Sequence, residues 1–199
     1  YESYNSIINI DIKPPSTYDK RISSTFYQAD ICNADISDYI KDADVVFLLA
    51  AKLQVQESID DPLLYNTNNV TGLLNVLQQC RLNGVRRVVF SSSASVYGNT
   101  SQLPIKEITP ASPLSPYALQ KYIGEKYCQL YSKIYNLDTV CLRYFNVYGQ
   151  GMPDTGSYSS VVSVFNRLKK QNKPLTVYGT GEQRRDFVYV RDVARANIL

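Results

Sequence analysis

The order in which apolar runs and helical stretches follow one another limits the fold of this chain more than any other feature. Short runs rich in Val, Ile and Phe alternate with longer stretches of helical periodicity. Several runs are apolar almost throughout, as strands covered on both faces are. Strand and helix in alternation form a parallel sheet with crossover helices. The sequence therefore predicts an α/β fold with a doubly wound, Rossmann-like parallel sheet.

The boundaries of these elements follow from the same pattern and from the residues that end helices. Strands are predicted at Ser6–Asp11, Thr25–Ala29, Asp44–Ala51, Val85–Ser92 and Thr139–Tyr144. Helices are predicted at Asp61–Leu82, Pro116–Tyr135, Ser157–Lys170 and, at the end of the sequence, Asp192–Leu199. Gly84 is placed to end the first helix and Pro116 suits a first helical turn. The proline-rich residues 99–115 are expected to form a surface loop over the carboxyl edge of the sheet.

Composition excludes several classes of function. The 199 residues carry a net charge of +3 with no basic block, so nucleic acid is not an expected partner. The four cysteines form no C-x-x-C pair, which fits a reducing, cytoplasmic protein. No apolar run reaches the roughly 20 residues that span a bilayer. The absence of histidine removes Ser-His-Asp and Cys-His nucleophiles and His-containing metal sites, and we expect no metal.

Asp11 marks the adenosine end of a dinucleotide site. It closes the first predicted strand, where an acidic residue accepts hydrogen bonds from the adenosine ribose about 20 residues after a glycine fingerprint. An acidic residue there also favours NAD over NADP, because it repels a 2′-phosphate. The first glycine is Gly72, and Asp192–Leu199 ends the sequence in mid-helix. We therefore expect this sequence to be the middle of a longer protein, without its first βα unit and its C-terminal region.

The chemistry is expected at Tyr117 and Lys121, which have the spacing Y-x-x-x-K and share one helical face. The spacing alone is weak, because Tyr122 and Lys126 repeat it. Context favours the first pair: Tyr117 begins a predicted helix, and a serine run that ends at Ser93 closes a buried strand, where active sites of open α/β sheets lie.

These side chains fit a hydride-transfer reaction. A tyrosine that acts as a base near neutrality needs its pKa lowered by about 3 units, or roughly 4 kcal/mol. A lysine ammonium and a cationic nicotinamide ring both act in that direction. We expect Ser93 to hold the substrate hydroxyl and relay its proton while the carbinol hydrogen leaves as hydride.

Several segments, taken together and in order, resemble one protein family. They are Asp11, Ala29–Ile31, Val46–Ala51, Asn69–Gly72, FSSSASVYG at Phe90–Gly98, Tyr117–Lys121, RYFNVYG at Arg143–Gly149 and GTGEQRRDFVYV at Gly179–Val190. This set resembles the extended short-chain dehydrogenase/reductases of the NAD-dependent epimerase/dehydratase family, closest to nucleotide-sugar epimerases of the UDP-glucose 4-epimerase type. The chain departs from that family at Leu48, where a histidine is usual, and at Leu53, where the closest epimerases commonly have lysine.

The resemblance implies a set of site residues. Ser93, Tyr117 and Lys121 take the catalytic roles: Tyr117 is the acid and base, Lys121 lowers its pKa and holds the ribose, and Ser93 relays the proton. The implied NAD-binding residues are Asp11, Asp30, Ile31, Ala50, Ala51, Leu53, Asn69, Ser91, Tyr117, Lys121 and Phe145. The implied UDP-sugar-binding residues are Ser93, Tyr117, Asn146 and Arg185, the last two at the phosphates. By the same resemblance, residues 1–150 form the NAD-binding core and 151–199 begin the substrate-binding region.

Two other functions stay open beside epimerisation at C4. Related dehydratases and decarboxylases typically place a carboxylate directly after the catalytic Ser or Thr, where this chain has Ala94, and they are therefore disfavoured. A non-catalytic NAD-binding scaffold protein is the second alternative. The family resemblance also implies a homodimer through the two long helices, to which Leu74, Tyr127 and Tyr131 could contribute, although core packing explains these residues equally well. The sugar is not fixed by the sequence.

Overall fold

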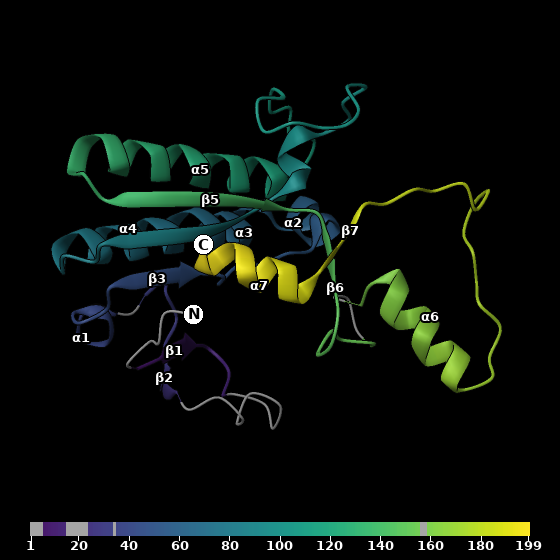
Figure 1. Cartoon of the computed structure of the whole chain (residues 1–199), viewed down its shortest axis with the longest axis horizontal. Helices are drawn as coiled ribbons and strands as arrows, with labels where there is room; N and C mark the ends of the chain where they lie inside the picture. Colours follow the sequence, from purple (N-terminus) through teal and green to yellow (C-terminus); the bar gives the residue numbers. More distant parts are fainter. Residues whose placement is uncertain (1–5, 15–23, 34, 156–158) are drawn as a thin grey trace. The chain divides into compact units, whose positions relative to one another are not determined.

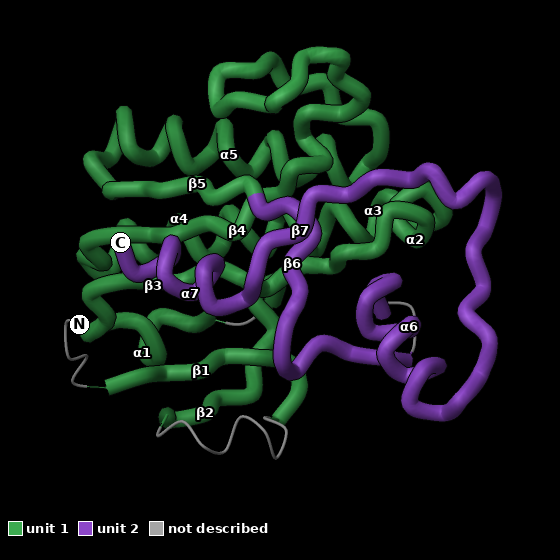
Figure 2. The backbone as a smooth tube through the Cα atoms, turned by 45° about the vertical axis from the view of Figure 1, so that its right-hand side comes forward, with its two compact units in different colours: residues 1–143 green, residues 144–199 purple. Residues whose placement is uncertain are grey.

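The computed structural model describes residues 6–14, 24–33, 35–155 and 159–199, and it shows a parallel-sheet α/β fold (Figure 1). The chain divides into two compact units, Tyr1–Arg143 and Tyr144–Leu199 (Figure 2). The predicted NAD-binding core, residues 1–150, therefore includes the first unit and the beginning of the second. That functional division stays a prediction.

The strands of the first unit form where they are predicted, with ends that differ by up to three residues. β1 (Ile8–Asp11) pairs in parallel with β2 (Thr25–Gln28), and β3 (Val45–Leu48), β4 (Arg87–Ser93) and β5 (Asp138–Tyr144) form a second sheet in that order. The register of the parallel β3–β4 pair runs from Val45 opposite Arg87 to Leu48 opposite Phe90. Within the described residues, the two groups of strands are not joined into the single continuous sheet that the pattern suggested.

Helix α5 has the predicted bounds, Pro116–Tyr135. The Ser115 hydroxyl accepts a hydrogen bond from the Ala118 N–H, and Pro116 occupies the first turn, where its missing N–H costs nothing. The helix ends at Asn136, which adopts the left-handed conformation with φ of 58°. An N-cap, a proline and a C-terminal asparagine thus fix both ends of the helix from local sequence alone.

The helix predicted at Asp61–Leu82 is in fact three consecutive segments. They are α3 (Pro62–Asn66), the π-helical turn η2 (Thr67–Thr71) and α4 (Gly72–Leu82). Gly84 follows α4 with φ of +69°, as expected of a residue that ends a helix. The pattern did not predict α1 (Ser37–Ile40), α2 (Val55–Asp60) or the 3₁₀ helix η3 (Ala94–Tyr97). A π turn keeps the helix continuous, so periodicity over a long window does not reveal it.

The core of the first unit lies between the sheet and helices α4 and α5. Leu77 and Cys80 of α4, Val88 of β4 and Cys128 of α5 are fully buried in it. Burial of each large aliphatic side chain contributes about 1.5–3 kcal/mol. Three further side chains pack against this cluster and are partly buried: Leu74, Tyr127 and Tyr131. Packing against the core therefore explains why these positions hold apolar or aromatic residues.

The second unit holds the parallel pair β6 (Asn146–Tyr148) and β7 (Phe187–Tyr189) and the helices α6 (Val161–Lys170) and α7 (Val190–Ile198). Helix α6 begins later than predicted, because the Ser160 side chain caps it at the Ser163 N–H; the predicted start at Ser157 lies outside the described residues. Helix α7 confirms the predicted last helix and begins two residues before it. The hydroxyl of Tyr144 and the amide of Asn197 are hydrogen bonded.

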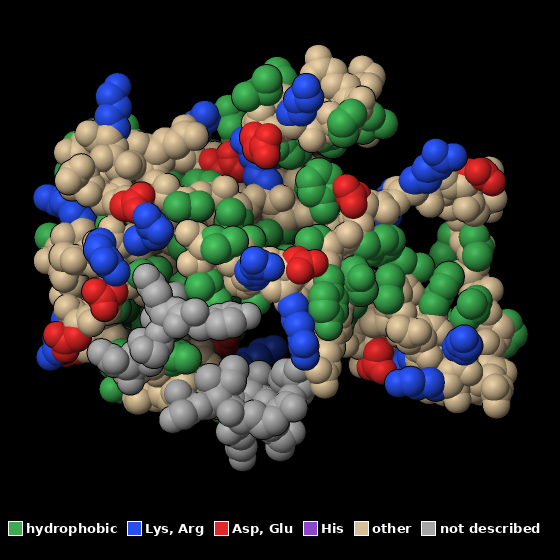
Figure 3. Space-filling view, viewed as in Figure 1, with side chains coloured by type: hydrophobic (Ala, Val, Ile, Leu, Met, Phe, Trp, Pro, Cys, Tyr) green, Lys and Arg blue, Asp and Glu red, His purple; other side chains and the backbone are tan. Residues whose placement is uncertain are grey.

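Charged side chains of both signs lie on the described surface. In the face shown in Figure 3, basic and acidic side chains are intermixed and form no large area of one sign. None of the helices in the described ranges is long and apolar enough to cross a bilayer.

The contact between α5 and β4 depends on Gly124. A Cβ atom at Gly124 would lie 2.6 Å from the ring of Phe90. We therefore predict that Gly124→Ala destabilises the protein by about 1–3 kcal/mol despite the higher helix propensity of alanine, measured by urea unfolding. Lys133→Ala, an exposed change on the same helix, serves as the control and should be near neutral. Equal stability of Gly124→Ala and wild type would contradict a tight helix–strand contact.

Candidate active site

The end of strand β4 brings the predicted catalytic residues together. The Lys121 ammonium donates a hydrogen bond of 2.8 Å to the carbonyl of Ser91. The Ser93 side chain lies close enough to the Tyr117 hydroxyl to lower its pKa through hydrogen bonding. Tyr117 and Lys121 lie one turn apart on α5, and the serines are consecutive on the strand. The three residues therefore lie together at the end of β4, as the helical spacing and the position of the serine run predicted.

Lys121 is a buried cation. Its side chain is 3% exposed, and the ammonium lies 5.0 Å above the centre of the Phe90 ring. Burial lowers the pKa of Lys121 from its ordinary 10.5 to about 8. None of the ion pairs within the described residues includes it. At neutral pH this ammonium is still mostly protonated, and it is held by a carbonyl and an aromatic ring.

The ionisation of Tyr117 differs from the expectation. The residue is 8% exposed, and burial raises the pKa of its hydroxyl, while the hydrogen bond with Ser93 lowers it. We expected the Lys121 ammonium to lower the Tyr117 pKa, but this ammonium is engaged at the Ser91 carbonyl. That expectation was wrong for this structure, because spacing on a helix gives proximity and not the direction in which a long side chain points.

Ser58 fixes the start of the helix that carries Tyr117. The backbone N–H of Tyr117 donates to the Ser58 hydroxyl at 3.1 Å, and that hydroxyl donates to the Val55 carbonyl at 2.6 Å. Ser58 is fully buried. One of the N–H groups that a helix start leaves unpaired is thereby satisfied from α2. Sequence reasoning missed Ser58, because a lone serine in an unpredicted helix carries no recognisable pattern.

Asn69 supports the segment that follows β3. Its Oδ1 accepts from the Lys52 N–H at 2.8 Å, and its Nδ2 donates to the Lys52 carbonyl at 3.0 Å and to Gln120 Oε1 at 3.1 Å. Next to Lys52, Ala51 is half-buried and Leu53 is exposed. Both amide hydrogens of Asn69 are thus used within the protein, and its evident role is to position this segment.

The segment after β3 has a further exposed residue, Ala50. The other predicted cofactor residues lie at the ends of β1 and β2. Asp11 is exposed at the carboxyl end of β1 and accepts from the Lys13 N–H at 2.9 Å. Asp30 follows β2 and accepts from the Cys32 N–H at 2.9 Å. Ile31 is buried in the core, where its side chain closely approaches Gly72. The two carboxylates are thus placed at strand ends, whereas Ile31 mainly packs inside the protein.

The predicted phosphate-binding residues belong to the second unit. Asn146 Nδ2 donates to the Asp186 carbonyl at 2.9 Å, so strand pairing brings Asn146 beside the residue that follows Arg185. Arg185 is exposed, and its Nη1 donates to the Arg184 carbonyl at 2.8 Å. Phe145 is half-buried directly before β6. Strand pairing thus brings together the two segments that carry Asn146 and Arg185, although no hydrogen bond between their side chains is formed.

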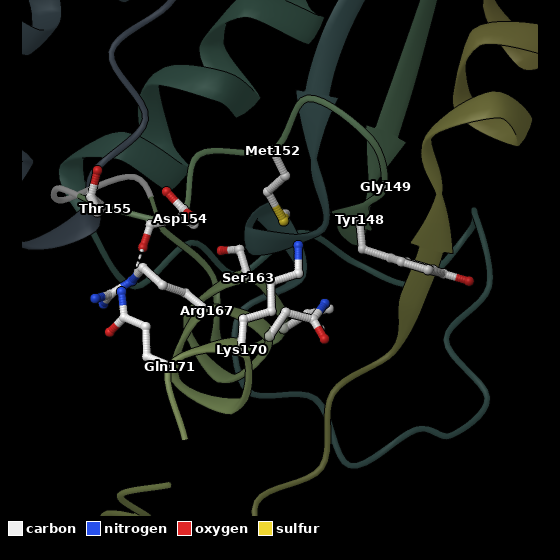
Figure 4. A pocket seen from close by; sticks show the side chains of 11 residues that line it. Tyr148, Gly149, Met152, Asp154, Thr155, Ser163, Arg167, Lys170 and Gln171 are labelled. Carbon is white, nitrogen blue, oxygen red and sulfur yellow. Dashed lines mark hydrogen bonds between the residues drawn. The ribbon is translucent and has the colours of Figure 1, made fainter. Parts of the chain in front are cut away.

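A separate cavity of about 530 Å³ lies in the second unit (Figure 4). Residues of α6 and of the segment that follows Tyr148 line it, including Met152, Ser163 and Lys170. Arg167 Nε donates across its rim to the Asp154 carbonyl at 2.9 Å. None of the predicted site residues lines this cavity. Within the described residues, no group of acidic, cysteine or histidine side chains is arranged to hold a metal ion.

Comparison with known proteins gives consistent results. The model of the NAD-dependent epimerase/dehydratase family matches residues 2–199. A UDP-glucose 4-epimerase of Mycolicibacterium smegmatis is 38% identical over 174 residues, which cover 86% of this chain and 55% of that protein. The chain therefore spans little more than half of the length of this relative.

Two solved structures resemble this chain in both fold and sequence. A UDP-N-acetylglucosamine 4-epimerase from Methanobrevibacter ruminantium M1, in complex with UDP-N-acetylmuramic acid, is 40% identical with a TM-score of 0.85, covering 88% of this chain and 56% of that one. A UDP-glucuronic acid 4-epimerase from Bacillus cereus, in complex with UDP-glucuronic acid and NAD, is 32% identical with a TM-score of 0.85, covering 97% and 64%.

The burial of Lys121 predicts a gain of stability on its removal. Between pH 8 and 10.5 the unfolded chain holds a proton at Lys121 that the folded protein has lost, so this residue makes stability rise with pH there. Lys121→Met should therefore raise the free energy of unfolding at pH 7 by about 1–3 kcal/mol, and this gain should shrink toward pH 10.5. Urea unfolding at both pH values measures it.

The exposed Lys126→Met is the matched control and should change stability little. A Lys121→Met protein that is less stable than wild type at both pH values would contradict a costly buried ammonium.

Proposed function

Because the chain belongs to the NAD-dependent epimerase/dehydratase family, we propose that the protein inverts C4 of a UDP-sugar in an NAD-dependent reaction. The observation that carries the proposal is the joining of Ser93, Tyr117 and Lys121 at the end of β4. Ligands bind at the carboxyl end of a parallel strand. There, a tyrosine, a lysine and a serine can supply the proton acceptor, the positive charge and the hydroxyl partner that assist hydride transfer at a carbinol carbon.

The residues of the first unit fit NAD. Asp11 offers an exposed carboxylate at a strand end, where a ribose hydroxyl can donate to it. The segment Ala50–Leu53, held by Asn69, offers small and apolar side chains next to the carboxyl end of β3. Bound NAD would supply the hydride acceptor and donor, together with a positive charge that favours the Tyr117 phenolate.

In the proposed mechanism, Tyr117 moves the proton of the sugar C4 hydroxyl. The phenolate accepts this proton as hydride leaves C4, which yields a 4-ketone, and returns it after the ketone has turned and been reduced from its opposite face. Ser93, which lies within hydrogen-bonding reach of Tyr117, holds the C4 oxygen and relays the proton. Lys121 remains an ammonium near neutral pH and would hold a ribose hydroxyl of bound NAD. The reaction causes no net oxidation.

The segment after Ser93 supports epimerisation over elimination. Ala94 and Ser95 occupy the positions where a dehydratase needs an extra acid or base, and the Ser95 hydroxyl donates to Ser93 Oγ at 2.9 Å. Asn146 and Arg185 are proposed to bind the diphosphate, since a guanidinium suits it. The two solved relatives hold different UDP-sugars, so the proposal does not restrict the sugar.

A homodimer is part of the proposal. Leu82 of α4 and Leu130 and Ile134 of α5 are exposed apolar side chains. Pairing of α4 and α5 with the same helices of a second copy would cover them.

The direct test uses the complete gene product that contains these residues, purified with added NAD. Inversion at C4 of UDP-glucose, UDP-N-acetylglucosamine and UDP-glucuronic acid is followed by proton NMR. Tyr117→Phe should lower kcat by about 10² to 10⁴, because the proton has no acceptor. Tyr122→Phe is the matched control: it changes the other Y-x-x-x-K tyrosine of the same helix, whose ring lies 4.9 Å from Lys126 Nζ, and should leave kcat unchanged. A 4-keto-6-deoxy product would instead identify a dehydratase, and bound NAD without turnover would identify a scaffold.

Cofactor choice gives a second test. Asp11→Asn should weaken NAD binding by about 5- to 30-fold, since the neutral amide accepts more weakly than a carboxylate, and should narrow the preference for NAD over NADP. Titration calorimetry with both cofactors measures this. Asp38→Asn, which removes an exposed carboxylate on α1, should change neither affinity. An unchanged NAD affinity in Asp11→Asn would remove Asp11 from the site.

A further inference from the structure

Glu125 is a buried carboxylate that the proposed reaction does not use. It follows Tyr117 and Lys121 on the same face of α5, one turn beyond Lys121, and is 2% exposed. Its Oε1 accepts from the Ser92 hydroxyl at 2.6 Å and from Arg143 Nε at 2.8 Å, and its Oε2 accepts from Arg143 Nη2 at 2.7 Å. One carboxylate therefore joins α5 to both β4 and β5.

Arg143, and not Lys121, neutralises this carboxylate. The Arg143 guanidinium binds Glu125 through two parallel hydrogen bonds, lies 4.5 Å from the centre of the Tyr97 ring and donates to the Glu107 carbonyl at 3.5 Å. A bidentate pair of this kind is both strong and fixed in direction. The Lys121 ammonium binds the Ser91 carbonyl instead, although the Glu125 carboxylate lies one helical turn away.

The three consecutive serines of β4 each face one of three successive turns of α5. The Ser91 carbonyl accepts from Lys121, the Ser92 hydroxyl donates to Glu125, and the Ser93 side chain lies within hydrogen-bonding reach of Tyr117. Because Ser92 lies between the other two serines, any shift of Ser92 moves both of them. Its bond to Glu125 is thus the anchor between the two contacts that the reaction needs.

We propose that Glu125 is a positioning residue: it holds Ser92 and neutralises Arg143, and so keeps the end of β4 in place and the Lys121 ammonium protonated at the Ser91 carbonyl. This inference rests on the proposed function for its kinetic consequence. Its structural and electrostatic consequence, the protonation of Lys121, can be measured without turnover.

The direction of the electrostatic effect follows from the charges on this face. Among the described residues, Arg143 of β5 and Cys128 of α5 interact with Glu125 directly. Cys141 of β5 contacts Cys128, Tyr97 of η3 contacts Arg143, and Tyr117 lies one turn before Lys121 on α5. Strand β4 contributes only serine groups and the Phe90 ring. Loss of the Glu125 charge leaves the guanidinium of Arg143 uncompensated, and this positive charge disfavours the ammonium of Lys121.

Glu125→Gln in the complete gene product tests the proposal, because glutamine preserves shape and removes charge. The first readout is the ¹³Cε NMR titration of lysine, with the Lys121 resonance assigned from Lys121→Arg. The second is the alkaline limb of the pH profile of kcat/KM. Both midpoints should fall by about one pH unit, and kcat should fall about tenfold while KM changes little, as expected of misplacement.

A second ion pair provides a matched control. Arg87 and Asp138 also join β4 to β5, through a bond of 2.6 Å between the first residues of both strands. Asp138→Asn should lower thermal stability and leave both midpoints and kcat unchanged. If Glu125→Gln behaves in the same way, Glu125 has a structural role only and the proposal is wrong.

Ser92→Ala covers the case in which Glu125→Gln does not fold, since it keeps the buried ion pair. It should lower kcat severalfold with KM preserved, and an unchanged kcat would overturn the proposal. If the wild-type protein turns over no UDP-sugar, the proposed function fails, and the Lys121 titration midpoint still decides whether Glu125 positions this lysine.

Discussion

The close contact between helix α5 and strand β4 is the constraint on which the site depends. Gly124 allows it, because a side chain at that position would collide with the ring of Phe90. At this separation, Lys121 reaches the Ser91 carbonyl and Tyr117 meets the serine side chain that ends the strand. A helix held farther from the sheet could carry the same residues in the same order and still not form the site.

The same close contact buries three ionisable side chains, and each is stabilised in a different way. Tyr117 stays neutral in its burial, with Ser93 within hydrogen-bonding reach. Glu125 is paired with Arg143, so its charge is compensated. Within the described residues, the charge of Lys121 has only a carbonyl and an aromatic ring as partners, and its lowered pKa shows that burial disfavours the charged form. The buried Lys121 charge therefore lowers the stability of the folded protein, and it is the charge that the proposed chemistry needs. Such a loss of stability is common at active sites.

The sequence allowed prediction of those features that local rules determine. Both ends of α5 follow from the Ser115 cap, the proline after it and Asn136, and the choice of Tyr117 over Tyr122 followed from its place at the helix start. Glu125 was missed because a polar residue on a helix looks like solvent-exposed surface until a distant arginine is known to reach it. The Tyr117 pKa was mispredicted because spacing fixes the separation of side chains on a helix and not their hydrogen-bond partners.

The side chains that hold the site in place belong to α2 and η2, a helix and a π turn that sequence periodicity did not predict. There is a physical reason for this. Ser58 of α2 holds the N–H of Tyr117, and Asn69 of the π-helical turn holds both the Lys52 backbone and the Gln120 side chain. Such contacts need single polar groups at irregular positions, and the π turn supplies one by altering the helical phase locally. The helix that carries Tyr117 and the segment after β3 therefore share these supports, so α2 and η2 set their relative placement. Neither α2 nor η2 carries a sequence pattern that predicts this role.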